Sequence, residues 1–446
     1  MNRFVKKLLS VILILGMVIA PLCEATTAYA SEAESNPMRA VWLRPKEWTK
    51  EQVEENVQKL ADTGINTIFL ETVYEGFTIF PVDYDYISQH PIHQEFDVLQ
   101  AYIDACHSRG MQLHCWVESF FIGLQTHRGG GPVYKALKGT DWLLADKEGN
   151  AWEETMYGKM YFLNPARPEC REWVVSLYEI IVENYDIDGI QLDYVRYPEK
   201  TASKDYGFDD YTVNAFMEKQ EAEGKDVYDP RDVKPNSFEA DVFAQFKRDQ
   251  ITEYVRMCST RLREIKPDLI LSLSVSPYYS NGIKNFMQSA ELWMDEGYGD
   301  LLVAMSYSEG MSALTTNSIG VACDSPANTV MGVSTINDFT IESVQKQVNT
   351  IVEAGAGVSF FEYETFYSEG YADSLKDTAL KDTQFNIDVD TYKTDVVRDD
   401  VVDVDEPVNV GEIILYVVLG VAVVAIVGEV IYLVISSKKK KRDSEE

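Results

Sequence analysis

Cysteine and histidine are scarce in this sequence, and their scarcity excludes several kinds of site. Six cysteines and five histidines occur in 446 residues, and no two cysteines form a CxxC pair. A disulfide framework or a thiolate zinc site needs cysteines at paired, regular spacing. HExxH and G-x-S-x-G are also missing, and no Lys-Ser or Lys-Thr follows Gly129-Gly130-Gly131, as a phosphate-binding loop requires. We therefore expect no metal and no cofactor.

Positive charge is also in short supply. Lys and Arg number 40 against 72 Asp and Glu, which gives a formal net charge of −32. A nucleic-acid partner needs clustered Lys and Arg to neutralise its phosphates. The composition therefore excludes nucleic acid as the expected partner and favours a well-solvated acidic surface.

The long apolar runs lie near the two ends of the chain. Residues 1–30 combine early basic residues, an apolar run and a final Ala-x-Ala, the pattern of a cleaved signal peptide. Residues 412–436 are apolar enough to cross a bilayer as one helix. The basic tail that follows, 437–446, is typical of a cytoplasmic end. We expect a single-pass protein of the cell membrane with its large part outside.

The chain between these ends divides into a linker and a domain. Residues 386–411 carry eight acidic residues and predict an extended acidic linker. In residues 31–385, short apolar β-rich runs alternate with amphipathic helices, the pattern of an α/β protein with a parallel sheet. Eight strands are predicted, at 39–44, 67–72, 112–118, 189–194, 269–275, 301–307, 329–335 and 357–363. This number predicts a (β/α)8 TIM barrel.

Asp193 is the first candidate for chemistry, because it ends the fourth predicted strand. Reactive groups of such barrels gather at the carboxyl ends of strands. Alternation places Gln191 and Asp193 on one face of that strand. A carboxylate closing a buried strand is costly unless it is paired or used. Arg196 lies close enough in sequence to be its partner, so a purely structural Asp–Arg pair is the alternative.

Other carboxylates also stand at or just after predicted strand ends, namely Glu71, Glu118, Glu309 and Glu362. Glycosidases use two carboxylates that flank the scissile bond. Residues on different strands cannot be paired by spacing, so both Glu118 and Glu362 are candidates to work with Asp193. Glu71 and Glu309 are expected to bind substrate, and a rim salt bridge is the alternative for any one of these glutamates.

Aromatic residues gather at the same strand ends, among them Trp116, Tyr194 and Tyr307. Sugar rings stack their C–H faces on aromatic rings while polar neighbours bond the hydroxyls. We expect these three side chains to bind substrate, with Arg196 beside them. For Trp116, which lies inside a strand, packing in the core is the alternative.

The ordered motifs of the chain resemble the glycosyl-hydrolase-like family 10 domain. The most specific match is DGIQLDYVRYP at 188–198, and the resemblance spans roughly residues 38–367. It implies an exported bacterial barrel protein, here expected in a Gram-positive cell, that acts on cell-wall glycan. Asp193 occupies the family's strand-four aspartate position, and Arg248 matches the helix arginine before strand five. The family often has Asn at the position of Glu118 and Gln at the position of Glu71, so this chain departs from it at both.

Three functions are compatible with these features of the sequence. The first is a glycoside hydrolase acting on a polysaccharide, with peptidoglycan glycan the expected partner and Asp193 plus a second carboxylate as its machinery. The second is a membrane-anchored barrel that binds glycan without cutting it, which the aromatic residues serve equally well. The third is a structural or interaction role without glycan affinity.

Overall fold

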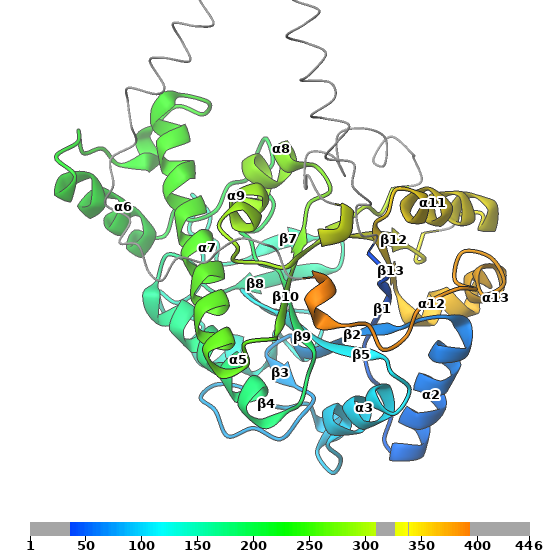
Figure 1. Ribbon diagram of the computed structural model, residues 1–446. Helices are drawn as coiled ribbons and strands as arrows, with labels where there is room; N and C mark the ends of the chain where they lie inside the picture. Colours follow the sequence, from blue (N-terminus) through cyan, green and yellow to red (C-terminus); the bar gives the residue numbers. More distant parts are fainter. Residues whose placement is uncertain (1–35, 309–325, 338, 393–446) are drawn as a thin grey trace, which may run out of the picture. The chain divides into compact units, whose positions relative to one another are not determined.

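Eight parallel strands form the centre of the molecule (Figure 1). The computed structural model describes residues 36–308, 326–337 and 339–392. The barrel strands are β1 (Arg39–Leu43), β2 (Thr67–Tyr74), β5 (Gln112–Glu118), β9 (Gly189–Asp193), β10 (Ile270–Val275), β11 (Leu301–Met305), β12 (Thr329–Ser334) and β13 (Gly357–Phe361). Each of the eight predicted strands is confirmed.

The sheet closes on itself. β1 pairs in parallel with β2 on one side and with β13 on the other. The remaining strands follow in chain order from β2 through β5, β9, β10, β11 and β12 to β13. A closed parallel sheet places the carboxyl ends of all eight strands on one face, which we call the mouth. The expectation of a TIM barrel is confirmed.

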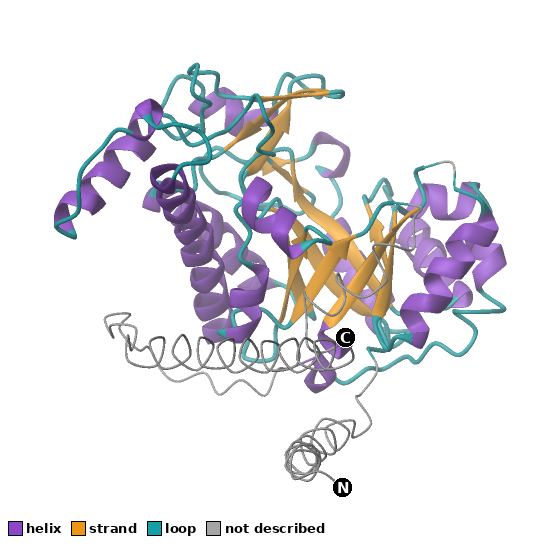
Figure 2. Cartoon of the chain, turned by 90° about the horizontal axis from the view of Figure 1, so that it is seen from above, coloured by secondary structure: helices purple, strands orange, loops and turns teal. Residues whose placement is uncertain are grey.

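Helices lie around the strands (Figures 1 and 2). They are α2 (Lys50–Thr63), α3 (Val98–His107), α5 (Pro168–Asn184), α7 (Phe238–Ile265), α9 (Ala290–Asp295), α11 (Ile341–Glu353), α12 (Tyr363–Ser368) and α13 (Tyr371–Leu375). Local signals explain their bounds. Thr49 caps α2 through a capping box with Gln52, and Gly64 ends it in the left-handed region. Thr340 caps α11 by accepting from the Ser343 N–H.

The long connections on the mouth side carry structure of their own. After β5, the strands β6 (Phe121–Leu124), β7 (Glu153–Thr155) and β8 (Gly158–Phe162) form a small antiparallel sheet. α4 (Gly131–Leu137) lies between β6 and β7. The remaining short elements are β3 (Phe77–Thr78), β4 (Ser88–Gln89), η1 (Pro91–His93), α6 (Asp210–Ala222), η2 (Pro230–Asp232), α8 (Tyr279–Asn281), η3 (Gly282–Phe286), η5 (Pro326–Asn328) and η6 (Val389–Tyr392).

Two separate apolar layers hold the barrel. The larger one packs the outer face of the strands against the helices. The smaller one fills the barrel interior, with Trp42, Phe69 and Trp116 among its members. Cys106, Cys115, Cys170 and Cys258 are buried and free, which agrees with their expected role as small packing residues.

The packed part of the chain reaches further than the sequence indicated. Residues 386–392, expected to begin the acidic linker, lie against the barrel, and Tyr392 is fully buried in the interior layer with Ile387 and Val389 beside it. The packed part of the chain therefore continues beyond residue 385 to at least Tyr392. Burial of these three apolar side chains outweighs the local acidity that suggested an extended chain.

The expected signal peptide, membrane span and basic tail lie outside the described residues. In the ranges that the structure describes, no helix is long and apolar enough to cross a membrane. Both terminal segments remain predictions.

Candidate active site

Two carboxylates stand side by side at the mouth. Glu118 ends β5 and Asp193 ends β9, and the two residues are register partners in the parallel pair. Adjacent strands lie about 4.8 Å apart, and partners in register project to the same face. Trp116 and Gln191, two residues earlier, are also partners and also face the barrel interior. The predicted alternation of Gln191 and Asp193 is therefore confirmed.

Two hydrogen-bond donors hold the carboxylate of Asp193. One carboxylate oxygen accepts from the Trp116 Nε1–H at 3.0 Å, and the other accepts from the Tyr194 backbone N–H at 2.7 Å. Its side chain is partly exposed. Burial raises the pKa of Asp193, while the Tyr194 N–H, the Arg196 charge and the Trp116 bond act in the opposite direction.

Glu118 lies in a different environment. It is only 6% exposed, and its carboxylate accepts from the backbone N–H of Glu75. Burial raises the pKa of Glu118 well above its usual value, and the negative charge of Glu71 raises it further. The pKa of both acids is therefore raised, and the two differ in degree, since Glu118 has the charge of Glu71 beside it whereas Asp193 has two donors and Arg196 that oppose the rise.

Glu71 supplies charge at this site. It is fully buried and forms a two-pronged ion pair with Arg44, in which Nη2 donates to Oε1 at 2.8 Å. The Arg44 guanidinium also lies 5.1 Å from the centre of the Tyr74 ring. A bulge in β2 directly after Glu71 shifts the register with β5 before Tyr74 is reached. Sequence reasoning missed Arg44, although its place at the end of the first predicted strand was a usable signal.

Aromatic rings form the layer beneath the acids. Tyr307 stacks on Phe361 with ring centres 5.1 Å apart, and both rings are partly exposed. Trp42 donates its Nε1–H to Gln191 at 2.8 Å and is 2% exposed, so it belongs to the core. Trp116 is 7% exposed, which favours packing and orientation of Asp193 over direct stacking on a sugar.

Tyr194 and Arg196 form one wall of the site. The Arg196 guanidinium lies between the rings of Tyr194 and Phe286, 4.9 and 5.0 Å from their centres. It makes no direct ion pair with Asp193 among the described residues, so the structural Asp–Arg pair is replaced by a longer-range attraction. Tyr194 itself packs on Phe121 at 4.8 Å and has a left-handed backbone, with φ of 47°.

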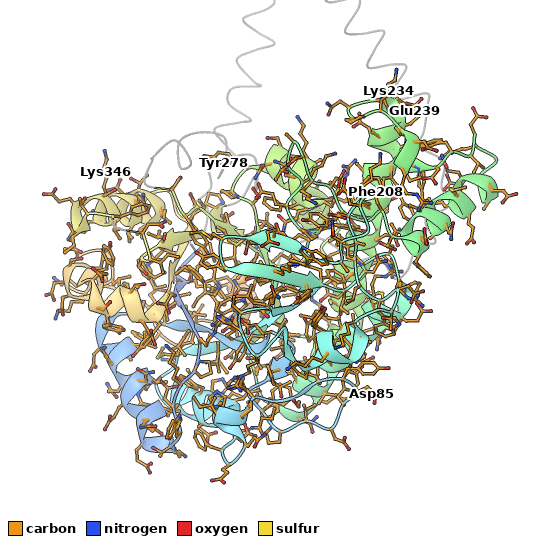
Figure 3. The ribbon with its side chains drawn as sticks, turned by 180° about the vertical axis from the view of Figure 1, so that it is seen from behind. Asp85, Phe208, Lys234, Glu239, Tyr278 and Lys346 are labelled. Atoms are coloured by element: carbon orange, nitrogen blue, oxygen red, sulfur yellow. The ribbon has the colours of Figure 1, made fainter. Side chains whose placement is uncertain are left out.

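The other side chains of interest have contacts or surroundings of their own. The Glu362 carboxylate caps α12 by accepting from the Thr365 N–H at 3.3 Å. Arg248 bonds Gln245 on its own helix, at 2.7 Å through Nη2. Glu309 lies outside the described residues. The aromatic Tyr278, which follows β10, is 42% exposed at the surface (Figure 3).

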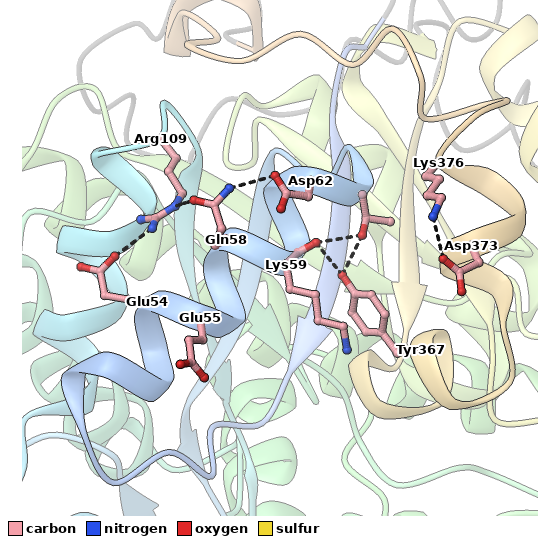
Figure 4. Close-up of a pocket in the computed structure, with 10 residues that line it drawn as sticks. Glu54, Glu55, Gln58, Lys59, Asp62, Arg109, Tyr367, Asp373 and Lys376 are labelled. Atoms are coloured by element: carbon pink, nitrogen blue, oxygen red, sulfur yellow. Dashed lines mark hydrogen bonds and ion pairs between the residues drawn. The ribbon is translucent and has the colours of Figure 1, made fainter.

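A surface hollow of about 740 Å³ lies elsewhere, on the outer side of α2 (Figure 4). Glu54, Lys59, Arg109 and Tyr367 are among the residues that line it. No residue from a strand end contributes to it, and several of its charged groups are paired, including Arg109 with Glu54 at 2.9 Å and Lys376 with Asp373 at 2.8 Å. The pair of acids at the mouth is therefore the candidate active site. Across the described ranges, no three side chains of His, Cys, Asp or Glu are placed to hold a metal ion together.

Comparison with known proteins agrees with this geometry. The family model described as glycosyl hydrolase-like 10 matches residues 37–354. Glycosyl hydrolase DigH of Escherichia coli K12 is 23% identical over 212 residues, covering 42% of this chain and 48% of DigH. Glycosyl hydrolase YngK of Bacillus subtilis is 22% identical over 330 residues, covering 66% of this chain and 58% of YngK. The chain thus matches about half the length of these relatives.

Solved structures show the same fold. The catalytic domain of a β-amylase from Paenibacillus polymyxa has a TM-score of 0.57 at 13% identity, covering 79% of this chain and all of that domain. A β-galactosidase from Halorubrum lacusprofundi has a TM-score of 0.50 at 16% identity, covering 73% of this chain and 53% of the enzyme. At such identities the likeness concerns the barrel alone, whereas the family model spans most of the sequence. The chain belongs to the glycosyl hydrolase-like 10 family.

Proposed function

We propose that this protein is a glycoside hydrolase in which Glu118 is the proton donor and Asp193 is the nucleophile or base. Family membership supports glycan hydrolysis in general. The observation that carries the assignment of roles is the register pair of Glu118 and Asp193. Burial raises the pKa of both acids, and the pKa of Glu118 stands well above its usual value because the negative charge of Glu71 adds to the effect of burial. Acid and base roles in one site are separated by environment in this way.

The steps use only these residues. Protonated Glu118 donates to the glycosidic oxygen as the bond to the anomeric carbon breaks, so the leaving sugar departs as an alcohol. Asp193 either attacks that carbon directly or takes a proton from the water that attacks it. Trp116 and the Tyr194 N–H keep Asp193 oriented toward the mouth during either course. Tyr307 and Phe361 offer ring faces on which a sugar stacks.

The substrate and location extend this proposal. The sequence resemblance supports a bacterial cell-wall glycan, and the apolar segments near both ends support an exported protein held at the cell membrane. The acidic surface, with a net charge of −32, supports a carbohydrate partner over a nucleic acid.

The test is release of reducing ends from a panel of glycans by residues 31–392. Asp193→Asn and Glu118→Gln should each lower the rate by roughly 10²-fold or more, with circular dichroism and the unfolding midpoint showing that the fold is kept. Glu264→Gln, at an exposed acid near the end of α7, is the matched control and should keep the wild-type rate. Turnover that survives either site substitution would remove that residue from the mechanism.

The non-catalytic alternative gives a different result. Glycan retained in a pull-down, with no reducing ends released over long incubation, would replace hydrolysis by binding. The partly exposed rings of Tyr307 and Phe361 serve both functions, so turnover decides between them.

A further inference from the structure

We propose that Glu75 and the glycine loop, residues 125–131, form a positioning element that sets the carboxylate of Glu118. This inference rests on the proposed function, since it concerns the proton donor. Glu75 follows directly after β2, and the glycine loop follows β6. The positioning element thus links the loops after β2 and β6 to Glu118, the proposed proton donor.

Glu75 holds Glu118 through its backbone. The Glu75 N–H donates to a carboxylate oxygen of Glu118, and Glu75 has a φ of 49°, in the left-handed region. This conformation is unfavourable for a residue with a side chain and persists only where the surroundings impose it. Gly76, with a φ of 74°, completes the turn that leads into β3.

The glycine loop imposes that conformation from two sides. The His127 ring bonds the Glu75 carboxylate at 2.6 Å, which fixes the side chain. Gly131 packs against the Glu75 carbonyl so closely that a Cβ at residue 131 would overlap the oxygen. Gly123 packs on the Gly130 carbonyl in the same manner, which fixes the loop itself. Side chain, carbonyl and N–H of Glu75 are therefore all held.

The loop has further contacts that keep its shape. Lys135 of α4 donates from Nζ to the Arg128 carbonyl at 2.6 Å. Arg128 also has a left-handed backbone, with φ of 49°. The three consecutive glycines, which fit no phosphate-binding motif, thus provide close approach to Glu75. An ordinary turn would need neither the contact with the Glu75 carbonyl nor the His127 bond.

Gly131→Ala and Gly139→Ala separate positioning from simple strain. Both glycines are left-handed, with φ of 79° and 83°, but a Cβ at 139 meets nothing within 4 Å. Both variants therefore carry the same backbone cost, and only Gly131→Ala displaces Glu75. We expect Gly131→Ala to lower kcat on the cleaved glycan about 10²-fold with little change in KM. Gly139→Ala should keep both constants, and equal kinetics in the two variants would overturn the proposal.

A second readout does not depend on turnover. The Glu118 carboxyl is titrated by ¹³C NMR in the intact 31–392 chain, with its signal assigned by comparison with Glu118→Gln. A carboxylate that loses an N–H donor becomes a weaker acid. We expect the pKa of Glu118 to rise in Gly131→Ala and to stay unchanged in Gly139→Ala. An inactive wild type would defeat the proposed function, whereas an unshifted titration in Gly131→Ala would defeat the positioning element.

Two substitutions of His127 test the hydrogen bond between its ring and the Glu75 carboxylate. Its ring is 53% exposed, so its replacement leaves the core intact. His127→Gln retains a donor for the Glu75 carboxylate, while His127→Ala removes it. We expect His127→Ala to shift the Glu118 titration in the same direction as Gly131→Ala, and His127→Gln to restore it. Identical titrations in both His127 variants and the wild type would exclude the side-chain part of the proposal.

Discussion

At the residue scale, the two acids at the mouth, Asp193 and Glu118, have different surroundings. Asp193 has two hydrogen-bond donors and a nearby guanidinium, whereas Glu118 has one donor, less exposure and the charge of Glu71. Donors and positive charge stabilise a carboxylate, while burial and negative charge stabilise the acid. Burial raises the pKa of Glu71 as well, and its ion pair with Arg44 opposes that rise.

Glu118→Gln should therefore change how stability depends on pH. The folded-state pKa of Glu118 lies above the ordinary value of 4.5, so between the two values the folded protein keeps a proton that the unfolded chain releases. Wild-type stability then falls as pH rises through that interval, by up to about 1.4 kcal/mol for each pH unit. The Glu118→Gln variant should not lose stability in this way. Urea unfolding of both proteins from pH 4 to 8 measures the difference, and free energies of unfolding that change with pH in parallel would contradict a raised pKa of Glu118.

At the element scale, the ends of strands and helices decide which acids face the mouth. Strand alternation carries Glu118 and Asp193 inward from neighbouring strands. Glu362 also follows a strand, but a helix begins one residue later, and the exposed N–H groups of α12 bind its carboxylate. The N–H groups at the start of a helix can thus bind an acid that follows a strand and that would otherwise face the site.

Glu362→Ala should therefore affect stability more than activity. Loss of the cap should lower the free energy of unfolding by about 1 kcal/mol, as measured by urea titration. Glu362→Asp, which keeps a capping carboxylate, is the matched control and should stay near the wild type. The rate of glycan cleavage should change less than threefold in both variants. A folded Glu362→Ala protein without activity would instead return Glu362 to the catalytic set.

At the scale of the whole domain, the described chain enters and leaves the barrel on the face opposite the mouth. Asn36 donates to the carbonyl of Thr329, where β12 begins, and Asn328 donates to the carbonyl of Tyr392. Parallel strands all begin on this face. Residues 386–392 therefore pack at the base of the barrel.

A chain of residues 31–385 should accordingly be less stable than one of residues 31–392. It lacks the fully buried Tyr392 ring, and loss of a buried aromatic side chain costs about 3–5 kcal/mol. Tyr392→Ala in the longer chain should reproduce most of the loss, which would assign it to packing at the base. Unfolding midpoints in urea provide the measurement. Coincident midpoints for the two chains would return the domain boundary to residue 385.

The sequence alone determined the barrel and the placement of Asp193 at a strand end. The eight strands follow from hydrophobic periodicity, which is a local property of the chain. Period-two alternation sufficed to place Gln191 and Asp193 on one face, whereas it left Glu118 and Glu362 as equal candidates for the second acid.

Only the tertiary structure decided which partner each acid has. Glu71 meets Arg44, Glu118 meets the Glu75 N–H 43 residues away, and Tyr392 closes the barrel base. These contacts join segments that approach one another only when the sheet closes and the long connections fold over its rim. Local patterns carry no information about such distances, so proton affinity at the mouth is a property of the closed barrel.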